Sequence, residues 1–458
     1  MKPIRNEGDN MSRLFGTDGV RGVANQELTI ELSMALGKYG AHVITKGKEK
    51  AKILVGKDTR ISGDLLEYAL IAGILSTGCD VIRVGVIPTP AIAKLVKTLG
   101  ADAGVMISAS HNPVAFNGIK FFNELGLKLS DDIEDEIEDC ISTKKQLHNP
   151  VGLNLGHVTD YEEAESDYIR YVIDTLDGIT FEGLKIAMDC ANGAASEVAP
   201  TALNSLDAKI YTIHHEPDGT NINENCGSTH LNDLMKFVKV VGADIGLAFD
   251  GDADRLLAID EHGNLVDGDK IMAICGKFLA EKGHLKDNTV VSTVMSNLGF
   301  DIALEENNMK SVKTQVGDRY VLEAMLANGY QLGGEQSGHI IFLEHNTTGD
   351  GLLTAVQILR VMKETGKTLS ELAAMMTVYP QVLKNAHVAN DKKYRFNENQ
   401  AVSERIVEIE AMFHGKGRVL IRPSGTEPLV RVMIEGENQN ELETVALELV
   451  TLIEREMN

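Results

Sequence analysis

The chain has 458 residues, of which 43% are hydrophobic and 24% are charged, and its formal net charge is -23. That length exceeds what one hydrophobic core normally serves, so three or four domains are expected. The negative charge repels nucleic acid phosphates and anionic membranes at long range, which argues against both as partners. Any anionic substrate must therefore be held by a local cationic pocket.

The cysteines and the start of the chain indicate a cytoplasmic protein. The five cysteines are odd in number, scattered and nowhere spaced as C-x-x-C, which argues against a disulfide framework and a zinc site. Residues 1–10 lack the apolar segment of a signal peptide, and no later run has the length needed to span a bilayer. Met11 is a candidate for the natural start, and we expect residues 1–10 to be an extension that takes no part in the fold.

One strand-to-loop unit occurs three times along the chain. The small, apolar strands of this unit are 100–105 (GADAGV), 242–247 (GADIGL) and, more weakly, 329–334 (GYQLGG). The polar loops that follow them contain Ser110, Asp250 and Glu335. Self-similarity of this kind predicts duplicated domains.

Short β-branched runs and helical patterns surround the three units. The runs are 53–55, 184–188 and 289–294, and the patterns with apolar positions three and four apart are 65–75, 231–241 and 320–327. This alternation predicts crossover helices packed on mostly parallel sheets. In such sheets, ligands gather at the carboxyl ends of the strands.

The last part of the chain has a different pattern. It contains strands at 418–421 and 429–434, a Gly/Pro/Ser loop between them and a helix at 439–456. The predicted fold class is therefore α/β, with three related α/β domains that have mixed, mostly parallel sheets, plus a C-terminal α+β domain. The predicted boundaries are 1–162, 163–262, 263–379 and 380–458.

Residues 15–22 (FGTDGVRG) form a glycine-rich loop that matches neither the P-loop nor the dinucleotide fingerprint. Backbone amides beside Arg21 suit contact with a phosphate group. A plain turn with a solvated arginine explains the pattern equally well. A nucleotide is not indicated.

Residues 108–113 (SASHNP) end a strand in a proline-locked turn, a setting that exposes a hydroxyl group. One of the two serines, Ser108 or Ser110, is therefore a candidate nucleophile. The alternative is a turn whose side chains only bond to the backbone. His111 fits that structural role better than the role of a base.

Asp250, Asp252 and Asp254 stand at alternate positions directly after the apolar run 245–249. Neighbouring carboxylates repel one another unless a cation neutralises them, and oxygen ligands suit Mg²⁺ or Ca²⁺. A solvated acidic loop is the plainer alternative. An EF-hand is excluded, because Arg255 occupies the position that needs glycine and a strand precedes the loop.

Residues 422–428 (RPSGTEP), followed by Arg431, place guanidinium groups, hydroxyl groups and a glycine in one loop between strands. The guanidinium group of arginine can bind two phosphate oxygens at once, so we interpret this loop as a phosphate-binding loop. A turn decorated with exposed polar groups is the alternative.

Together these loops resemble the signatures of the α-D-phosphohexomutase superfamily, from about Met11 to the C-terminal helix. The matching strings are ISASHNP at 107–113, DGDADR at 250–255, GEQSGH at 334–339 and RPSGTEP at 422–428, with FGTDGVRG at 15–22 and GDRYV at 317–321. Ala253 departs from the glycine that many family members carry. The departure alters no metal ligand and is expected to cost little.

The resemblance implies a role for the residues around the acidic loop. Ser110 would carry the phosphoryl group and complete the shell of one Mg²⁺ ion with Asp250, Asp252 and Asp254, whereas Ser108 would have no role. Arg255 would sit beside the ion and assist. The implied acid and base groups, with no division of labour among them, are Lys120, His339 and Arg21. From the residues alone, Lys120 is better explained as a solvated lysine on a strand, and His339 as a turn histidine whose hydrogen bonds are satisfied.

The resemblance also implies the substrate contacts. Those for the sugar hydroxyls are Glu335 and Ser337. Those for the phosphate that is not transferred are Arg422, Ser424, Gly425, Thr426 and Arg431.

The implied activity is that of a mutase that moves a phosphoryl group between positions 6 and 1 of a sugar phosphate, with four domains around one central cleft. Glucosamine or glucose 1,6-bisphosphate is the expected intermediate and activator, and the product would supply UDP-N-acetylglucosamine and peptidoglycan synthesis. The sugar loop favours glucosamine phosphates, with glucose or mannose phosphates as the alternative. A Mg²⁺-dependent sugar-phosphate phosphatase and a noncatalytic sensor are alternatives from other classes. The assembly is left open, with a homodimer as one option.

Overall fold

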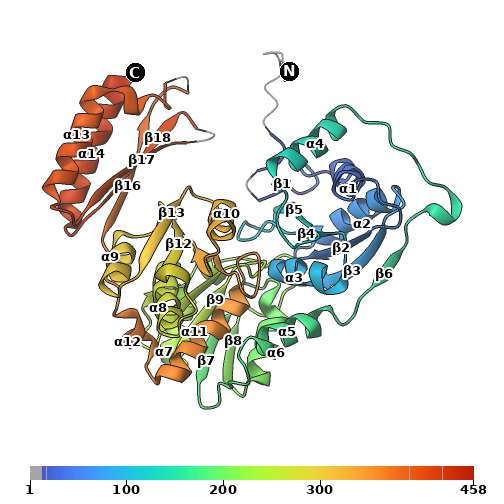
Figure 1. Ribbon diagram of the computed structural model, residues 1–458, viewed down its shortest axis with the longest axis horizontal. Coiled ribbons are helices and arrows are strands. Elements are labelled where there is room, and N and C mark those ends of the chain that lie inside the picture. Colours follow the sequence, from blue (N-terminus) through green and yellow to red (C-terminus); the bar gives the residue numbers. More distant parts are fainter. Residues whose placement is uncertain (1–12, 17, 391, 425–426, 458) are drawn as a thin grey trace. The chain divides into compact units, whose positions relative to one another are not determined.

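The computed structural model describes residues 13–457 except Thr17, Asp391, Gly425 and Thr426 (Figure 1). The expectation for residues 1–10 and the roles given to Gly425 and Thr426 therefore fall outside the described residues. The chain divides into two compact units. The larger unit contains the residues up to 294 together with 312–373, and the smaller unit contains 295–311 and the residues from 374 onward.

The first sheet of the larger unit has six strands in the order β1-β5-β4-β2-β3-β6. They are β1 (Val20–Val23), β2 (Lys52–Lys57), β3 (Asp80–Val86), β4 (Ala103–Ile107), β5 (Phe116–Asn123) and β6 (Val158–Asp160). β4, β2, β3 and β6 pair in parallel, and β5 pairs antiparallel with both β4 and β1. The helices of this part are α1 (Ile30–Ile44), α2 (Ser62–Leu75), α3 (Thr89–Leu99) and α4 (Asp131–Ser142).

The second sheet has five strands in the order β11-β10-β9-β7-β8. They are β7 (Lys185–Asp189), β8 (Lys209–Ile213), β9 (Ile245–Phe249), β10 (Leu256–Asp260) and β11 (Leu265–Val266). β8, β7 and β9 are parallel, and β10 is antiparallel to β9. The helices are α5 (Ala164–Asp174), α6 (Ala195–Ser205) and α7 (Asn232–Val241).

The third sheet has the order β13-β12-β14-β15. Its strands are β12 (Thr289–Thr293), β13 (Lys310–Thr314), β14 (Leu332–Gly334) and β15 (Ile340–Phe342). The accompanying helices of the larger unit are α8 (Gly268–Glu281), α10 (Asp318–Asn328), α11 (Gly351–Thr365) and α12 (Leu369–Ala373).

The three sheets share one strand order, which confirms the duplication predicted from the repeated strand-to-loop unit. In each sheet the order β3-β2-β4-β5 recurs, as β8-β7-β9-β10 and as β13-β12-β14-β15. The glycine that opens each repeat is the left-handed C-cap of the preceding helix: Gly100 after α3, Gly242 after α7 and Gly329 after α10. Glycine takes this conformation without a steric penalty, so the repeat ends a helix and starts a buried strand.

The smaller unit has a three-stranded antiparallel sheet in the order β16-β18-β17. Its elements are α9 (Leu298–Glu306), β16 (Gln381–His387), α13 (Gln400–Met412), β17 (Arg418–Pro423), β18 (Leu429–Glu435) and α14 (Gln439–Met457). Figure 1 shows α13 and α14 side by side against this sheet, and their apolar side chains form its core. The predicted α/β class with a C-terminal α+β part is confirmed. Among the described residues, no helix is long and apolar enough to cross a membrane.

Candidate active site

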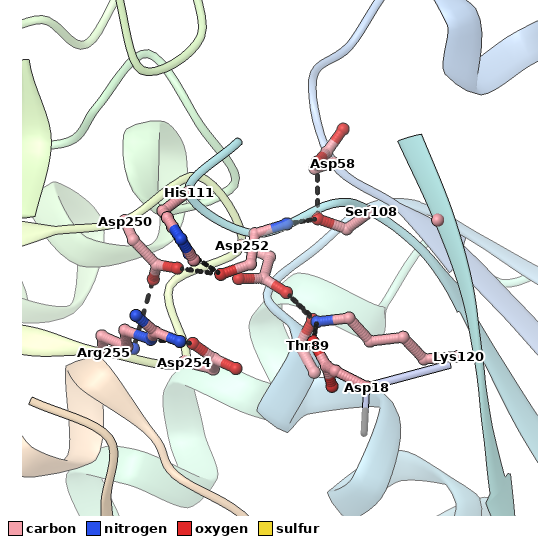
Figure 2. A network of polar contacts seen from close by, with 12 residues as sticks. Asp18, Asp58, Thr89, Ser108, His111, Lys120, Asp250, Asp252, Asp254 and Arg255 are labelled. Carbon is pink, nitrogen blue, oxygen red and sulfur yellow. Dashed lines mark hydrogen bonds and ion pairs between the residues drawn. The ribbon is translucent and has the colours of Figure 1, made fainter. Parts of the chain in front are cut away.

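Ser110 and Asp250 follow strands of two different sheets and are joined by a hydrogen bond. Ser110 comes after β4 and Asp250 after β9, and the Ser110 hydroxyl donates to Asp250 Oδ2 at 2.6 Å. Figure 2 shows Asp250 together with its neighbours His111 and Arg255. Both residues are 1% exposed. His111 Nδ1 lies 3.3 Å from the same hydroxyl oxygen, and burial, together with the charges of Arg255 and Arg21, lowers the pKa of this histidine. The hydroxyl therefore faces the Asp250 carboxyl group and the His111 imidazole.

Ser108 holds the backbone of Ser110 in an unusual conformation. Ser110 has a φ of 52°, in the left-handed region that L residues rarely adopt. Its N–H donates to Ser108 Oγ at 2.9 Å, and the fully buried Ser108 hydroxyl donates to Asp58 Oδ2 at 2.6 Å. The expectation that Ser108 has no role is therefore wrong, because its side chain fixes the loop that presents Ser110.

Arg60 and Asn223 hold the carbonyl groups of the loop 108–113. Arg60 donates to the carbonyl oxygens of Ser110, Asn112 and Pro113 at 2.9, 2.8 and 2.7 Å. Asn223 Nδ2 donates to the carbonyl oxygens of Ser110 and Asn112 at 2.8 and 3.0 Å. Arg60 follows β2 and Asn223 lies beyond β8, so segments from two sheets anchor the same loop.

The three aspartates after β9 form a buried cluster. Asp250, Asp252 and Asp254 are 1%, 0% and 4% exposed, and one carboxylate oxygen of each lies within 4.8 Å of the others. Asp252 Oδ1 and Asp254 Oδ1 are buried without a hydrogen-bond partner among the residues that the structure describes. Buried carboxylate oxygens without partners suit a hard divalent cation such as Mg²⁺, so the residues present fit the predicted metal site.

Ala253 lies inside this cluster with a left-handed φ of 55°. A β-carbon in that conformation costs roughly 1–2 kcal/mol, which glycine would avoid. Alanine in place of the family's glycine therefore affects the backbone and not the metal ligands. Its steric cost comes in addition to the lost freedom of the loop, so it is larger than the sequence suggested.

The carboxylates of the cluster are electrostatically unequal. Burial and repulsion by Asp254 and Asp252 raise the pKa of Asp250 well above its usual range. Burial acts in the same direction on Asp252, but Lys120 and the hydroxyl of Thr89 outweigh it and lower the pKa of Asp252. The Thr89 hydroxyl donates to Asp252 Oδ2 at 2.6 Å. A divalent cation would relieve the repulsion on Asp250.

Lys120 is buried between two carboxylates. It lies on β5, opposite Met106 of β4, and is 1% exposed. Its Nζ donates to Asp252 Oδ2 at 2.7 Å and lies 2.9 Å from Asp18 Oδ2. Burial opposes a charge here, but Asp18 and Asp252 outweigh it and raise the pKa of Lys120. Lys120 is thus a buried ammonium beside the acidic cluster and not a solvated strand residue.

Arg21 reaches this cluster through Asp18. The Arg21 guanidinium is hydrogen-bonded to Asp18, and Arg21 Nε is buried without a hydrogen-bond partner among the described residues. Burial raises the pKa of Asp18, but Lys120, Lys128 and Arg21 outweigh it and hold the pKa well below its usual range. The glycine-rich loop 15–22 therefore contributes a carboxylate as well as an arginine.

His339 and Arg255 both approach Asp254. His339 Nδ1 lies 3.4 Å from Asp254 Oδ2, and Arg255 Nε lies 3.7 Å from Asp254 Oδ1. Gly349 N–H donates to His339 Nε2 at 2.9 Å, which places the ring proton on Nδ1, facing Asp254. The backbone N–H of Arg255 also donates to Asp250 Oδ1 at 3.2 Å. The structure therefore brings all of the predicted acid, base and metal residues into one network.

The loop 334–339 carries the two candidate sugar contacts. Glu335 is half-buried, and its Oε1 accepts a hydrogen bond from Gly317 N–H at 3.1 Å. Ser337 is exposed. A β-carbon at Gly268 would lie 2.2 Å from the Glu335 carbonyl oxygen, so this loop packs closely on the start of α8. Contact of Glu335 and Ser337 with a sugar stays a prediction.

In the smaller unit, Arg422 and Arg431 are directly opposite each other on β17 and β18. Burial and the charge of Arg431 lower the pKa of Arg422. Arg431 Nη2 lies 3.4 Å from Glu427 Oε2, and the buried Ser424 hydroxyl accepts a bond from Glu427 N–H at 3.2 Å. Like charges in opposite positions destabilise a sheet, and a bound phosphate would offset that repulsion.

Sequence reasoning missed several residues that support the cluster, among them Asp58, Arg60, Thr89 and Asn223. The first two follow β2 and Thr89 follows β3, at the carboxyl ends of parallel strands, where Ser110 also lies. The rule that ligands gather at the carboxyl ends of parallel strands could have found these three residues. Asn223 comes from a long loop without a local motif, and no sequence signal indicated it.

The chain belongs to the phosphoglucomutase/phosphomannomutase family. The α/β/α domains I, II and III of that family match residues 12–148, 166–263 and 267–379, and its C-terminal domain matches residues 383–452. The chain is therefore an enzyme of the mutase class, and the recognised signatures lie in the expected domains.

Curated relatives named phosphoglucosamine mutase are similar to almost the whole chain. The relative from Clostridium novyi is 59% identical over 449 residues, which cover 98% of this chain and 100% of the relative. The relative from Ruminiclostridium cellulolyticum is 60% identical over 446 residues, which cover 97% of this chain and 99% of the relative.

Solved structures of more distant proteins share the fold. A phosphoglucomutase/phosphomannomutase family protein from Burkholderia thailandensis has a TM-score of 0.79 at 22% identity, over 96% of this chain and 98% of that one. The N-acetylphosphoglucosamine mutase of Aspergillus fumigatus, solved with GlcNAc-6P and magnesium, has a TM-score of 0.70 at 18% identity, over 97% of this chain and 96% of that one.

Proposed function

We propose that this chain is a phosphoglucosamine mutase, which interconverts glucosamine 6-phosphate and glucosamine 1-phosphate through phosphorylated Ser110 and glucosamine 1,6-bisphosphate. The observation that carries the proposal is the buried bond from the Ser110 hydroxyl to Asp250 at 2.6 Å, inside a cluster of three aspartates. The identity of about 59% to relatives of that name, over their full length, supports the choice of sugar.

Two transfers of one phosphoryl group account for the reaction. In the first, the bond from phosphorus to Ser110 Oγ breaks while a bond to the free sugar hydroxyl forms; the sugar hydroxyl proton passes to a base, and Ser110 Oγ takes up a proton. In the second, the phosphoryl group at the other end of the sugar moves back to Ser110 Oγ, which gives up its proton, and the departing sugar oxygen takes up a proton. Atoms and charge balance over the cycle, so no further co-reactant is consumed.

The contacts of Ser110 and Lys120 suit the second transfer, in which the serine oxygen accepts the phosphoryl group. Ser110 keeps its proton and directs it to Asp250, and Lys120 is an ammonium because Asp18 and Asp252 favour its charge. Lys120 therefore acts as the acid that protonates the departing sugar oxygen, and the same amine is the base in the first transfer. A Mg²⁺ ion bound by Asp250, Asp252, Asp254 and the Ser110 oxygen would neutralise charge on the transferring phosphoryl group.

The remaining roles follow from charge and exposure. His339, Arg21 and Arg255 surround the acidic cluster with positive or ionisable groups, which suits a substrate that carries two phosphates. Glu335 and Ser337 would bind the sugar hydroxyls. Arg422, Ser424 and Arg431, in the smaller unit, would bind the phosphate that is not being transferred, with Gly425 and Thr426. The five free, buried cysteines agree with a cytoplasmic location. The oligomeric state stays open, with a homodimer as one option.

A coupled assay that compares glucosamine, glucose and mannose 6-phosphates, each with and without glucose 1,6-bisphosphate, tests the proposal. We expect turnover of glucosamine 6-phosphate to exceed that of the other two, to require Mg²⁺ and to rise with the bisphosphate. Ser110→Ala, which keeps the fold but lacks the acceptor oxygen, is the matched control. A preference for glucose or mannose phosphate would assign a different mutase. Sustained release of inorganic phosphate without isomerisation would assign a phosphatase.

A further inference from the structure

Lys128 joins two carboxylates that come from different domains. Its Nζ lies 2.5 Å from Asp18 Oδ1 and 2.6 Å from Asp318 Oδ2, and its side chain is 15% exposed. Asp18 belongs to the glycine-rich loop beside the first sheet, and Asp318 opens α10 beside the third sheet. Burial opposes the Lys128 charge, but Asp18 and Asp318 outweigh it and raise the pKa of this lysine. Lys128 is thus a fixed cation between the two domains.

The first arm of this junction leads to Lys120. Asp18 offers Oδ1 to Lys128 and Oδ2 to Lys120 at 2.9 Å. A carboxylate that is shared in this way cannot rotate without losing one of its two ammonium partners. Lys128 therefore fixes the orientation in which Asp18 holds Lys120 against Asp252, where Nζ donates at 2.7 Å.

The second arm leads to the sugar loop. The residue before Asp318 is Gly317, whose N–H donates to Glu335 Oε1 at 3.1 Å. Asp318 Oδ2 also lies 3.4 Å from His339 Nε2. By holding Asp318, Lys128 fixes the start of α10 and with it the backbone group that orients the Glu335 side chain.

We propose that Lys128 is a positioning residue that couples the proton-transfer lysine, through Asp18, to the sugar-binding glutamate, through Asp318. The inference rests on the proposed mutase function and deepens it. Nothing in the motifs indicated this residue, because Lys128 stands outside every signature string. Its loss should impair chemistry through Lys120 and substrate binding through Glu335 together, which loss of an ordinary ion pair between domains would not do.

Arg319 supplies the matched control. It follows Asp318 directly and also bridges the two domains, with Nη1 at 2.6 Å from Asp131 Oδ1, and its other ion-pair partner among the described residues is Glu323, which is not a site residue. Steady-state kinetics should be compared for wild type, Lys128→Met and Arg319→Gln, with thermal denaturation of each to confirm folding. Methionine keeps the length of the side chain without its charge.

We expect Lys128→Met to lower kcat and to raise KM, each about tenfold, because small displacements of reacting groups cost rate steeply. Arg319→Gln should stay within about twofold of wild type, as expected for a partly exposed ion pair. If Lys128→Met is too unstable to assay, the double variant Lys128→Met/Asp318→Asn, which removes the Lys128 charge together with that of one of its two partners, should fold and still show the loss in kcat.

Double-mutant cycles separate positioning from a general structural effect. The effect of Lys128→Met on kcat should be non-additive with Asp18→Asn, and its effect on KM should be non-additive with Glu335→Gln. Additive effects, unchanged kinetics, or equal losses in Lys128→Met and Arg319→Gln would overturn the proposal. If wild type prefers glucose or mannose phosphate, the proposed sugar is wrong, and the same comparison on the preferred substrate still decides the role of Lys128.

Discussion

The Ser108 hydroxyl bridges Asp58 and the backbone of Ser110, accepting from Ser110 N–H at 2.9 Å and donating to Asp58 Oδ2 at 2.6 Å. The two serines of the loop thus have different tasks, although their residue type and their place at a strand end are the same. The Ser110 hydroxyl donates to Asp250, and Ser108 keeps the Ser110 backbone in its left-handed conformation.

Replacing each serine by alanine should distinguish these tasks. Ser110→Ala should lose nearly all mutase turnover, because it removes the oxygen that carries the phosphoryl group. Ser108→Ala should leave a buried N–H without a partner, which costs about 1–3 kcal/mol, so turnover should fall roughly tenfold while phosphate still labels Ser110. Phosphopeptide mapping together with turnover of both purified variants checks this. Label on Ser108 would contradict the assignment.

Asp252→Asn should weaken Mg²⁺ binding and activity severely without unfolding the protein. Asparagine keeps the size of the side chain and still accepts the Thr89 hydroxyl bond, but it removes an anionic ligand. Because loss of a mere outer-shell partner typically costs roughly 10–100-fold in metal affinity, loss of a direct ligand should cost at least that. Calorimetric titration with Mg²⁺ is the measurement. Wild-type affinity in the variant would show that the ion, if any, binds elsewhere.

Arg422→Ala should lower kcat/KM by about two to three orders of magnitude in both directions, because remote binding energy positions the reacting centre. More 1,6-bisphosphate should escape into the medium. The thermal midpoint should not fall, since the change relieves repulsion between opposite arginines. Unchanged kinetics in both directions, with no added bisphosphate in solution, would mean that the phosphate is held by other residues.

His214→Asn should change stability in a pH-dependent way. The hydrogen bond to Asp189 at 2.9 Å raises the pKa of His214 above its ordinary value of 6.5. A raised native pKa stabilises the fold fully below pH 6.5, and that contribution is lost as the pH rises through the native value. Asparagine tolerates the left-handed φ of 48° at this position, so backbone strain should change little.

The measurement is the thermal midpoint of wild type and His214→Asn at pH 5.5 and pH 8.5. The deficit of the variant should be larger at pH 5.5 than at pH 8.5, because the charge-dependent contribution is present at the lower pH and lost as the pH rises through the native pKa. An equal deficit at both pH values would show that the Asp189 contact does not depend on the charge of His214.

Much of the fold could be predicted because each repeat is defined by residues that are close together in the sequence. The glycine caps Gly100, Gly242 and Gly329 end helices in the left-handed conformation, and the buried strands that follow contain small or branched residues. Local patterns of this kind do not depend on distant contacts, so the elements around them were placed well. The predicted strand 429–434 and helix 439–456 end within a residue of β18 and α14.

The acidic cluster could be predicted from spacing, whereas its supports could not. Asp250, Asp252 and Asp254 are close in sequence, so their convergence needs no tertiary information. Asn223 and Lys128 act through residues more than a hundred positions away, at 2.8 Å from the Ser110 carbonyl and 2.6 Å from Asp318. Such contacts depend on the packing of one domain against another, and neither the periodicity of the sequence nor the spacing of its motifs gives information about that packing. The four domain boundaries likewise stay predictions.

The anchoring of the Ser110 carbonyl by Arg60 and Asn223 has a consequence for which partner moves during turnover. Because hydrogen bonds from two domains hold the Ser110 backbone, the serine cannot move from one end of the sugar to the other. Under the proposed mechanism, the ligand would be the moving part and would have to leave its contacts halfway through each cycle. Every turnover would then include a moment at which the bisphosphate intermediate is free to diffuse away, and an enzyme that lost it would need another bisphosphate from solution to start again.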